Sequence, residues 1–69
     1  MISEFEIWRS ARLMISQFAE HAPTQAVRRA TTLEHRADVD GWMKWMRIAE
    51  AILEIQAAPP SAKVAPERG

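Results

Sequence analysis

The chain has 69 residues, enough for one small domain, and it contains no cysteine, which excludes disulfides and cysteine-ligated zinc as sources of stability. Nine basic and nine acidic residues give a formal net charge of zero, so the chain as a whole does not attract nucleic acid or an anionic membrane. The hydrophobic fraction of 48% excludes a fully disordered chain. No apolar run reaches the ~18 residues of a membrane span, and no secretory signal opens the sequence, so we expect a cytoplasmic protein without membrane contact.

The first expected helix covers residues 4–20. Ser3 and Glu6 form an S-x-x-E capping box, which is typical of a helix start. Apolar residues then recur three or four positions apart and therefore share one face. That face contains Ile7, Trp8, Ala11, Met14, Ile15, Phe18 and Ala19, and it excludes Phe5 and Leu13. Because Pro23 disfavours the helical conformation in Ala22, the sequence "EHAPT" predicts the end of the helix.

The second expected helix covers residues 24–37. Its inner stripe is mostly alanine, which contributes little transfer energy but allows a neighbouring helix to approach closely. The stripe consists of Ala26, Ala30, Leu33 and Ala37, with Val27 beside it. The outer surface carries Arg28, Arg29, His35 and Arg36 against one acidic residue, Glu34.

The third expected helix covers residues 39–57. Asp38 is a good N-cap, and Gly41 in the first turn can permit a close approach of another chain segment. The remaining residues, 58–69, are rich in proline and alanine without apolar periodicity, which predicts a disordered C-terminal tail. The expected fold is all-α, a small three-helix bundle formed by one domain, residues 1–57.

Two apolar rows lie along the third expected helix. Trp45, Ile48, Ile52 and Ile55 recur at heptad-like spacing and form a core seam, and Trp42, Met46, Ala49 and Leu53 form a second row beside it. The remaining arc contains Asp40, Met43, Lys44, Arg47, Glu50, Ala51 and Glu54. Its charges predict two pairs, Asp40–Lys44 and Arg47–Glu50.

Together the two rows cover about half of the helix, more than a surface helix needs. Two interpretations remain open: both rows belong to the core, or one edge is covered by a second copy of the chain or by another protein. Tryptophan and methionine are enriched at interfaces. The candidate partner-binding residues are Trp42, Met43, Met46 and Leu53.

The sequence "EIWRSARLMISQFAEHAPTQAVRRATTLEHRADVDGWMKWMRIAEAILEI" resembles a family of short alphaproteobacterial proteins known only as a domain of unknown function. The family frame has a tryptophan and an alanine in the first helix, a "G-x-x-A" turn, "A-x-R-A-x-x-L", "G-D-x-x-G" and "W-x-x-I-x-x-A-I-x-x-L". Positions that fit it are Trp8, Ala11, Ala26, Arg29, Ala30, Leu33, Asp38, Gly41, Trp45, Ile48, Ala51, Ile52 and Ile55. Ala37 replaces a glycine of the frame, and Ala19-Glu20-His21 replaces its glycine turn. The resemblance implies a helical fold and a bacterial or phage origin, but no known activity.

Few residues offer chemistry for catalysis. His21 and His35 lie on separate expected elements, and no glycine-rich phosphate loop is present. A solvated histidine near a helix C-terminus is the simpler interpretation of His35. We expect no enzyme, no metal and no cofactor.

Nucleic-acid binding is the alternative function, and it depends on Arg28, Arg29 and Arg36. The third expected helix would present tryptophan and isoleucine to base edges, which a recognition helix does not do. Protein binding therefore remains the strongest class: a homodimer, an adaptor or an inhibitor of a larger protein.

Overall fold

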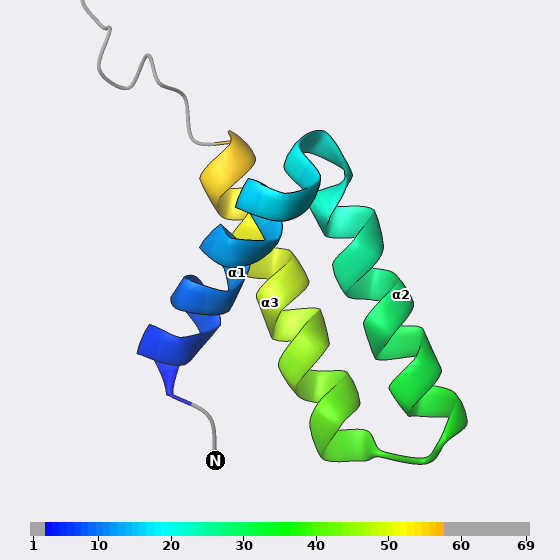
Figure 1. The fold of residues 1–69 in the computed structure, drawn as a ribbon. Helices are drawn as coiled ribbons and strands as arrows, with labels where there is room; N and C mark the ends of the chain where they lie inside the picture. Colours follow the sequence, from blue (N-terminus) through cyan, green and yellow to red (C-terminus); the bar gives the residue numbers. More distant parts are fainter. Residues whose placement is uncertain (1–2, 58–69) are drawn as a thin grey trace, which may run out of the picture.

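The computed structural model describes residues 3–57, in which the secondary structure is helical and no β-strand occurs (Figure 1). Helix α1 spans Glu4–Phe18, the single 3₁₀ turn η1 spans Ala19–His21, α2 spans Ala22–His35 and α3 spans Val39–Ala57. The expected all-α class is confirmed. The predicted disordered tail, residues 58–69, lies outside the described residues. None of the described helices has the length and apolar character needed to cross a bilayer.

Helices α2 and α3 form an antiparallel hairpin, and α1 lies against the C-terminal part of α3 (Figure 1). Two side-chain contacts show which part of α3 lies beside α1. Near the start of α1, Glu4 contacts Arg47, and just past its end Ala19 contacts Gln56. These contacts place α1 alongside α3 from about Arg47 onward, so the first two turns of α3 extend beyond α1.

The bend between α1 and α2 occurs at Ala19 and not at Pro23, which corrects the expected boundaries. Ala19 has φ 49° and ψ −122°, whereas Ala22 is helical with φ −57° and ψ −43°. α1 therefore ends two residues earlier than expected, and α2 begins two residues earlier. Pro23 is accommodated in the first turn of α2, where a helix does not need its N–H group.

Helix α2 ends at His35, before the expected residue 37, because Ala37 adopts φ 62°. The N–H of Ala37 donates to the carbonyl of Glu34 at 2.9 Å, and the N–H of Asp38 donates to that of Leu33 at 2.9 Å. This is the hydrogen-bond pattern of a Schellman motif, in which the left-handed position is usually glycine. The turn into α3 therefore uses an alanine where glycine is favoured.

Helix α3 begins as predicted. The Asp38 carboxylate accepts the N–H of Gly41 at 2.9 Å, which is an N-cap hydrogen bond. A Cβ added to Gly41 would lie 2.7 Å from Asp38 Oδ2 and 3.0 Å from Leu33 Cδ1. The predicted close approach at Gly41 is thus present, and the capping carboxylate itself occupies the space.

The core lies where the three helices meet. Its buried members are Ile7, Ala11, Met14, Ala22, Ala26, Ile48, Ala49, Ala51 and Ile52, with Trp8, Ile15, Phe18, Trp45 and Ile55 packed partly against them. The assignment of Ala51 to the polar arc is wrong, because Ala51 is fully buried. Because α1 and α2 contact different sides of α3, the buried part of the α3 surface is wide enough to include Ala51.

Candidate partner-binding surface

Five apolar residues lie on the outer side of α3 within an arc of about 100°, with Glu50 between the last two of them. They are here called the α3 stripe: Val39, Trp42, Met43, Met46 and Leu53. Val39, Met43 and Leu53 are 62%, 57% and 54% exposed, and Trp42 and Met46 are half-buried. Val39, Met46 and Leu53 follow at seven-residue intervals, so they lie in one row along the helix. The structure thus brings the four predicted partner-binding residues onto one face and adds Val39 to them.

The α3 stripe is only partly covered, because the neighbouring elements reach its edges alone: Glu34 and Ala37 line a hollow with Val39 and Trp42, and Glu6 of α1 lines another with Met43. α1 starts at the level of Arg47, beyond the first three residues of the stripe. α2 presents fully buried alanines to the core, Ala22, Ala26 and Ala30, and these side chains are too short to extend around α3. Large apolar side chains of the stripe therefore remain in water, although burial would stabilise each of them.

A small hollow opens beside Trp42. It is lined by Glu34, Ala37, Val39 and Trp42, and its volume is about 240 Å³. The hollow is therefore smaller than a typical small-molecule site, which has a volume of ~300–1,000 Å³.

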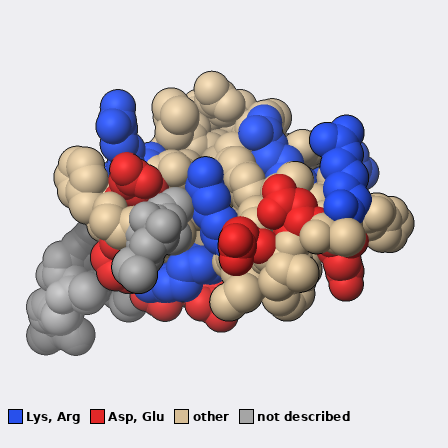
Figure 2. Space-filling model, turned by 90° about the horizontal axis from the view of Figure 1, so that it is seen from below, with Lys and Arg blue, Asp and Glu red and all other residues tan. Residues whose placement is uncertain are grey.

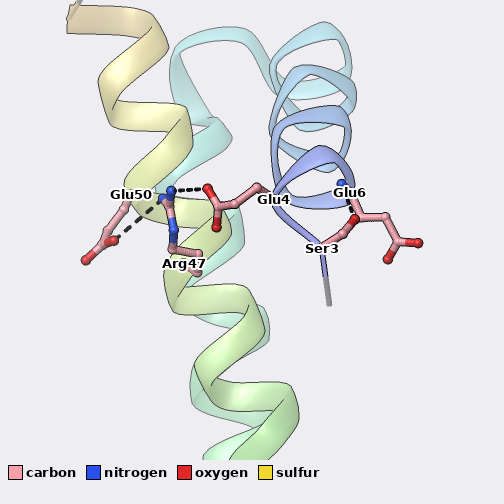
Figure 3. A network of polar contacts seen from close by, with 5 residues as sticks. All are labelled: Ser3, Glu4, Glu6, Arg47 and Glu50. Carbon is pink, nitrogen blue, oxygen red and sulfur yellow. Dashed lines mark hydrogen bonds and ion pairs between the residues drawn. The ribbon is translucent and has the colours of Figure 1, made fainter. Parts of the chain in front are cut away.

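Arg47 connects α3 to α1 at the edge of the stripe (Figure 3). Its guanidinium donates to Glu4 at 2.8 Å, lies 3.7 Å from Glu50 and stacks over the Trp8 ring at 5.6 Å. The predicted Arg47–Glu50 pair is therefore present, whereas no ion pair joins Asp40 and Lys44 in the described part of the chain. Figure 3 also shows one half of the predicted capping box at the start of α1: the N–H of Glu6 donates to Ser3 Oγ at 3.2 Å, whereas the Glu6 side chain points away from Ser3.

The three arginines of the alternative site do not act as one group. Arg29 stacks over the Trp45 ring at 5.0 Å and so faces α3. Arg28, the adjacent residue, points about 100° away, and it borders a hollow on the outer face of α2 with Thr24, Thr31 and His35. Arg36 lies just beyond the end of the helix.

Charges of both signs are interspersed on the molecular surface. In Figure 2 the blue and red groups alternate across the face seen from below, and neither sign dominates it. One mixed hollow between the starts of α1 and α3 brings Glu6, Asp38, Asp40 and Lys44 together. Asp38 already caps α3 there, and no group of three or more acidic, histidine or cysteine side chains within residues 3–57 could hold a metal ion.

Two residues that contribute to the stripe or to the packing of α1 were not identified from the sequence. The position of Val39 in the stripe could have been read from its spacing to Met43 and Met46. Gln56 carried no such signal: its side-chain amide donates to the Ala19 carbonyl at 2.8 Å, a contact between residues 37 positions apart. Such a contact depends on how α1 folds back against α3.

Comparisons of the chain with models of protein families, with curated proteins and with solved structures give no match. The resemblance to the alphaproteobacterial family therefore remains a prediction. The geometry of the α3 stripe is the basis for a functional proposal.

Proposed function

We propose that this protein is a non-enzymatic interaction module of the cytoplasm, a small three-helix bundle that binds itself or a larger protein through the α3 stripe. The observation that carries the proposal is the simultaneous exposure of Val39, Met43 and Leu53 on one face, at 62%, 57% and 54%. Contiguous exposed apolar surface is typical of interaction sites, whereas single exposed apolar residues are ordinary. An adaptor or an inhibitor of a larger protein would use the surface in the same way.

The chemistry of the stripe favours a helical or flat apolar partner surface. Trp42 and Met46 are half-buried, so they are already partly ordered and lose little conformational freedom on binding. Arg47 flanks one side of the stripe, and its ion-pair partner Glu50 lies between Met46 and Leu53, so a partner would meet apolar and charged groups together. Mixed apolar and polar contacts are usual in non-obligate protein interfaces.

The test is site-specific photo-crosslinking in the source cells, with a photoreactive phenylalanine derivative in place of Leu53. Leu13 provides a matched control, since it is the same residue type on α1 with 58% exposure against 54% for Leu53. We expect position 53 to crosslink to one defined protein, either a second copy or a larger partner, and position 13 to give no such product. Equal products from both positions, or none from position 53, would contradict the proposal.

Nucleic-acid binding by α2 is the second candidate. It is supported by the hollow around Arg28 and His35, which no carboxylate lines. The stacking of Arg29 on Trp45 weakens it, because this guanidinium is partly engaged within the fold. Retention on a DNA column at ~0.15 M salt that is lost in Arg28→Ala/Arg36→Ala, but kept in the α1 control Arg9→Ala/Arg12→Ala, would favour this function.

A further inference from the structure

The junction between α1 and α2 is short and strained. α1 ends at Phe18, α2 begins at Ala22, and only the three residues of η1 lie between them. Ala19 holds φ 49° and ψ −122°, a region that residues with a Cβ rarely occupy. Phe18 (φ −119°, ψ −3°) and His21 (φ −91°, ψ 1°) deviate less from helical geometry, and Ala22 is helical. Straightening the junction therefore requires its largest backbone change at Ala19, with smaller changes at Phe18 and His21.

The surface that α1 covers consists of contacts that a second chain can supply unchanged. Ile7, Ala11 and Met14 of α1 are buried in the same core as Ile48 and Ile52 of α3. At the start of α1, Glu4 pairs with Arg47 at 2.8 Å. If α1 leaves its own hairpin, the α1 of another copy fits the same place with the same partners. No new complementary surface is needed.

We propose that α1 exchanges between two copies of this chain, with Ala19 as the hinge, to give a swapped homodimer. Short hinges under strain favour such exchange, because the open form releases the strain while the exchanged contacts stay the same. The inference goes beyond the proposed function, since it uses the inner face of α1 and leaves the α3 stripe free.

Two features of the junction oppose the exchange, and one of them determines the conformation of the opened chain. Gln56 donates to the Ala19 carbonyl at 2.8 Å in the closed form, and this hydrogen bond must be broken. Pro23 cannot donate to Ala19, and its ring disfavours a straight helix through this point. The opened chain is therefore a long helix that is kinked before Pro23.

The first experiment measures mass and connectivity together. Sedimentation equilibrium of the wild-type chain from about 1 µM to about 1 mM should show the mass rising toward twice the monomer value. In parallel, Glu4→Cys/Arg47→Cys is treated with a short thiol crosslinker, which reacts only there because the chain has no other cysteine. A swapped dimer gives covalent dimers. A monomer throughout the range, or a dimer in which the crosslink joins positions within one chain, would overturn the proposal.

The second experiment isolates the hinge strain. Ala19→Gly and Ala37→Gly both place glycine at a positive-φ alanine, but only Ala19 lies in the hinge. Strain released at each hinge lowers the dimer dissociation constant about tenfold, and a dimer has two hinges. Ala19→Gly removes this strain from the monomer, so it should raise the dissociation constant by about 100-fold. Ala37→Gly should leave the dimerisation constant unchanged. Equal dimerisation of Ala19→Gly and wild type would refute the role of the hinge.

Discussion

At the scale of single residues, the two turns of this fold place alanines where the backbone favours glycine. Ala19 and Ala37 have φ 49° and φ 62°, and they are the positive-φ residues of the described chain. A Cβ is disfavoured at both places, so glycine would be the unstrained residue there.

Ala37→Gly should therefore stabilise the protein. Removing the Cβ relieves about 1–2 kcal/mol of left-handed strain and so stabilises the folded chain. The greater conformational freedom of glycine in the unfolded chain opposes this gain by about 0.4–1 kcal/mol. We expect a net gain of roughly 0.5–1 kcal/mol in the free energy of unfolding, measured by urea denaturation. Ala30→Gly, inside α2 and fully buried, should change stability in the opposite direction. A loss of stability in Ala37→Gly would contradict the strain at this turn.

The cap of α3 predicts coupling between Asp38 and Gly41. Asp38→Ala removes the cap and should cost about 1 kcal/mol. Gly41→Ala gains helix propensity in either background, but in the wild type its Cβ meets Asp38 Oδ2 at 2.7 Å and displaces the cap. The effect of Gly41→Ala on the free energy of unfolding should thus be more stabilising by about 1 kcal/mol in the Asp38→Ala background than in the wild type. Additive effects in this double-mutant cycle would show that the two residues do not share the space.

At the scale of elements, the sequence predicts those features that depend on local spacing. Capping residues marked the starts of α1 and α3, and the heptad-like row identified Ile48 and Ile52 as core. The bend at Ala19 was not predictable, because alanine carries no turn signal. Ala51 was misplaced because burial on α3 depends on the positions of two other helices. The exposure of Val39 and Met43 likewise follows from where α1 begins.

The junction of α1 and α2 gives a prediction for Gln56. Its hydrogen bond to the Ala19 carbonyl replaces the one that Pro23 cannot make, and Gln56→Ala should cost about 1 kcal/mol in thermal or urea unfolding. Gln17→Ala is the control, since this exposed side chain on α1 makes no hydrogen bond within residues 3–57 and should change stability by less than ~0.5 kcal/mol. Equal effects of the two substitutions would argue against the contact.

At the scale of the whole molecule, much of the core is alanine. Six of the ten buried hydrophobic residues are alanine, and the largest fully buried side chains are Ile7, Ile48 and Ile52. A domain of this size has a free energy of unfolding of roughly 3–8 kcal/mol. A few isoleucines therefore supply a large share of the apolar burial that stabilises the fold.

Ile52→Ala and Leu53→Ala compare the core and the α3 stripe at neighbouring positions. Ile52 is fully buried, so its truncation should cost about 2–5 kcal/mol and leave the chain partly unfolded at 25 °C. Leu53 is 54% exposed, so Leu53→Ala should retain wild-type stability within about 0.5 kcal/mol while losing affinity for the partner. Circular dichroism during urea titration reports stability, and binding or mass measurements report association. If Leu53→Ala destabilised the isolated chain as much as Ile52→Ala, the stripe would belong to the folding core, and its assignment to a partner would be wrong.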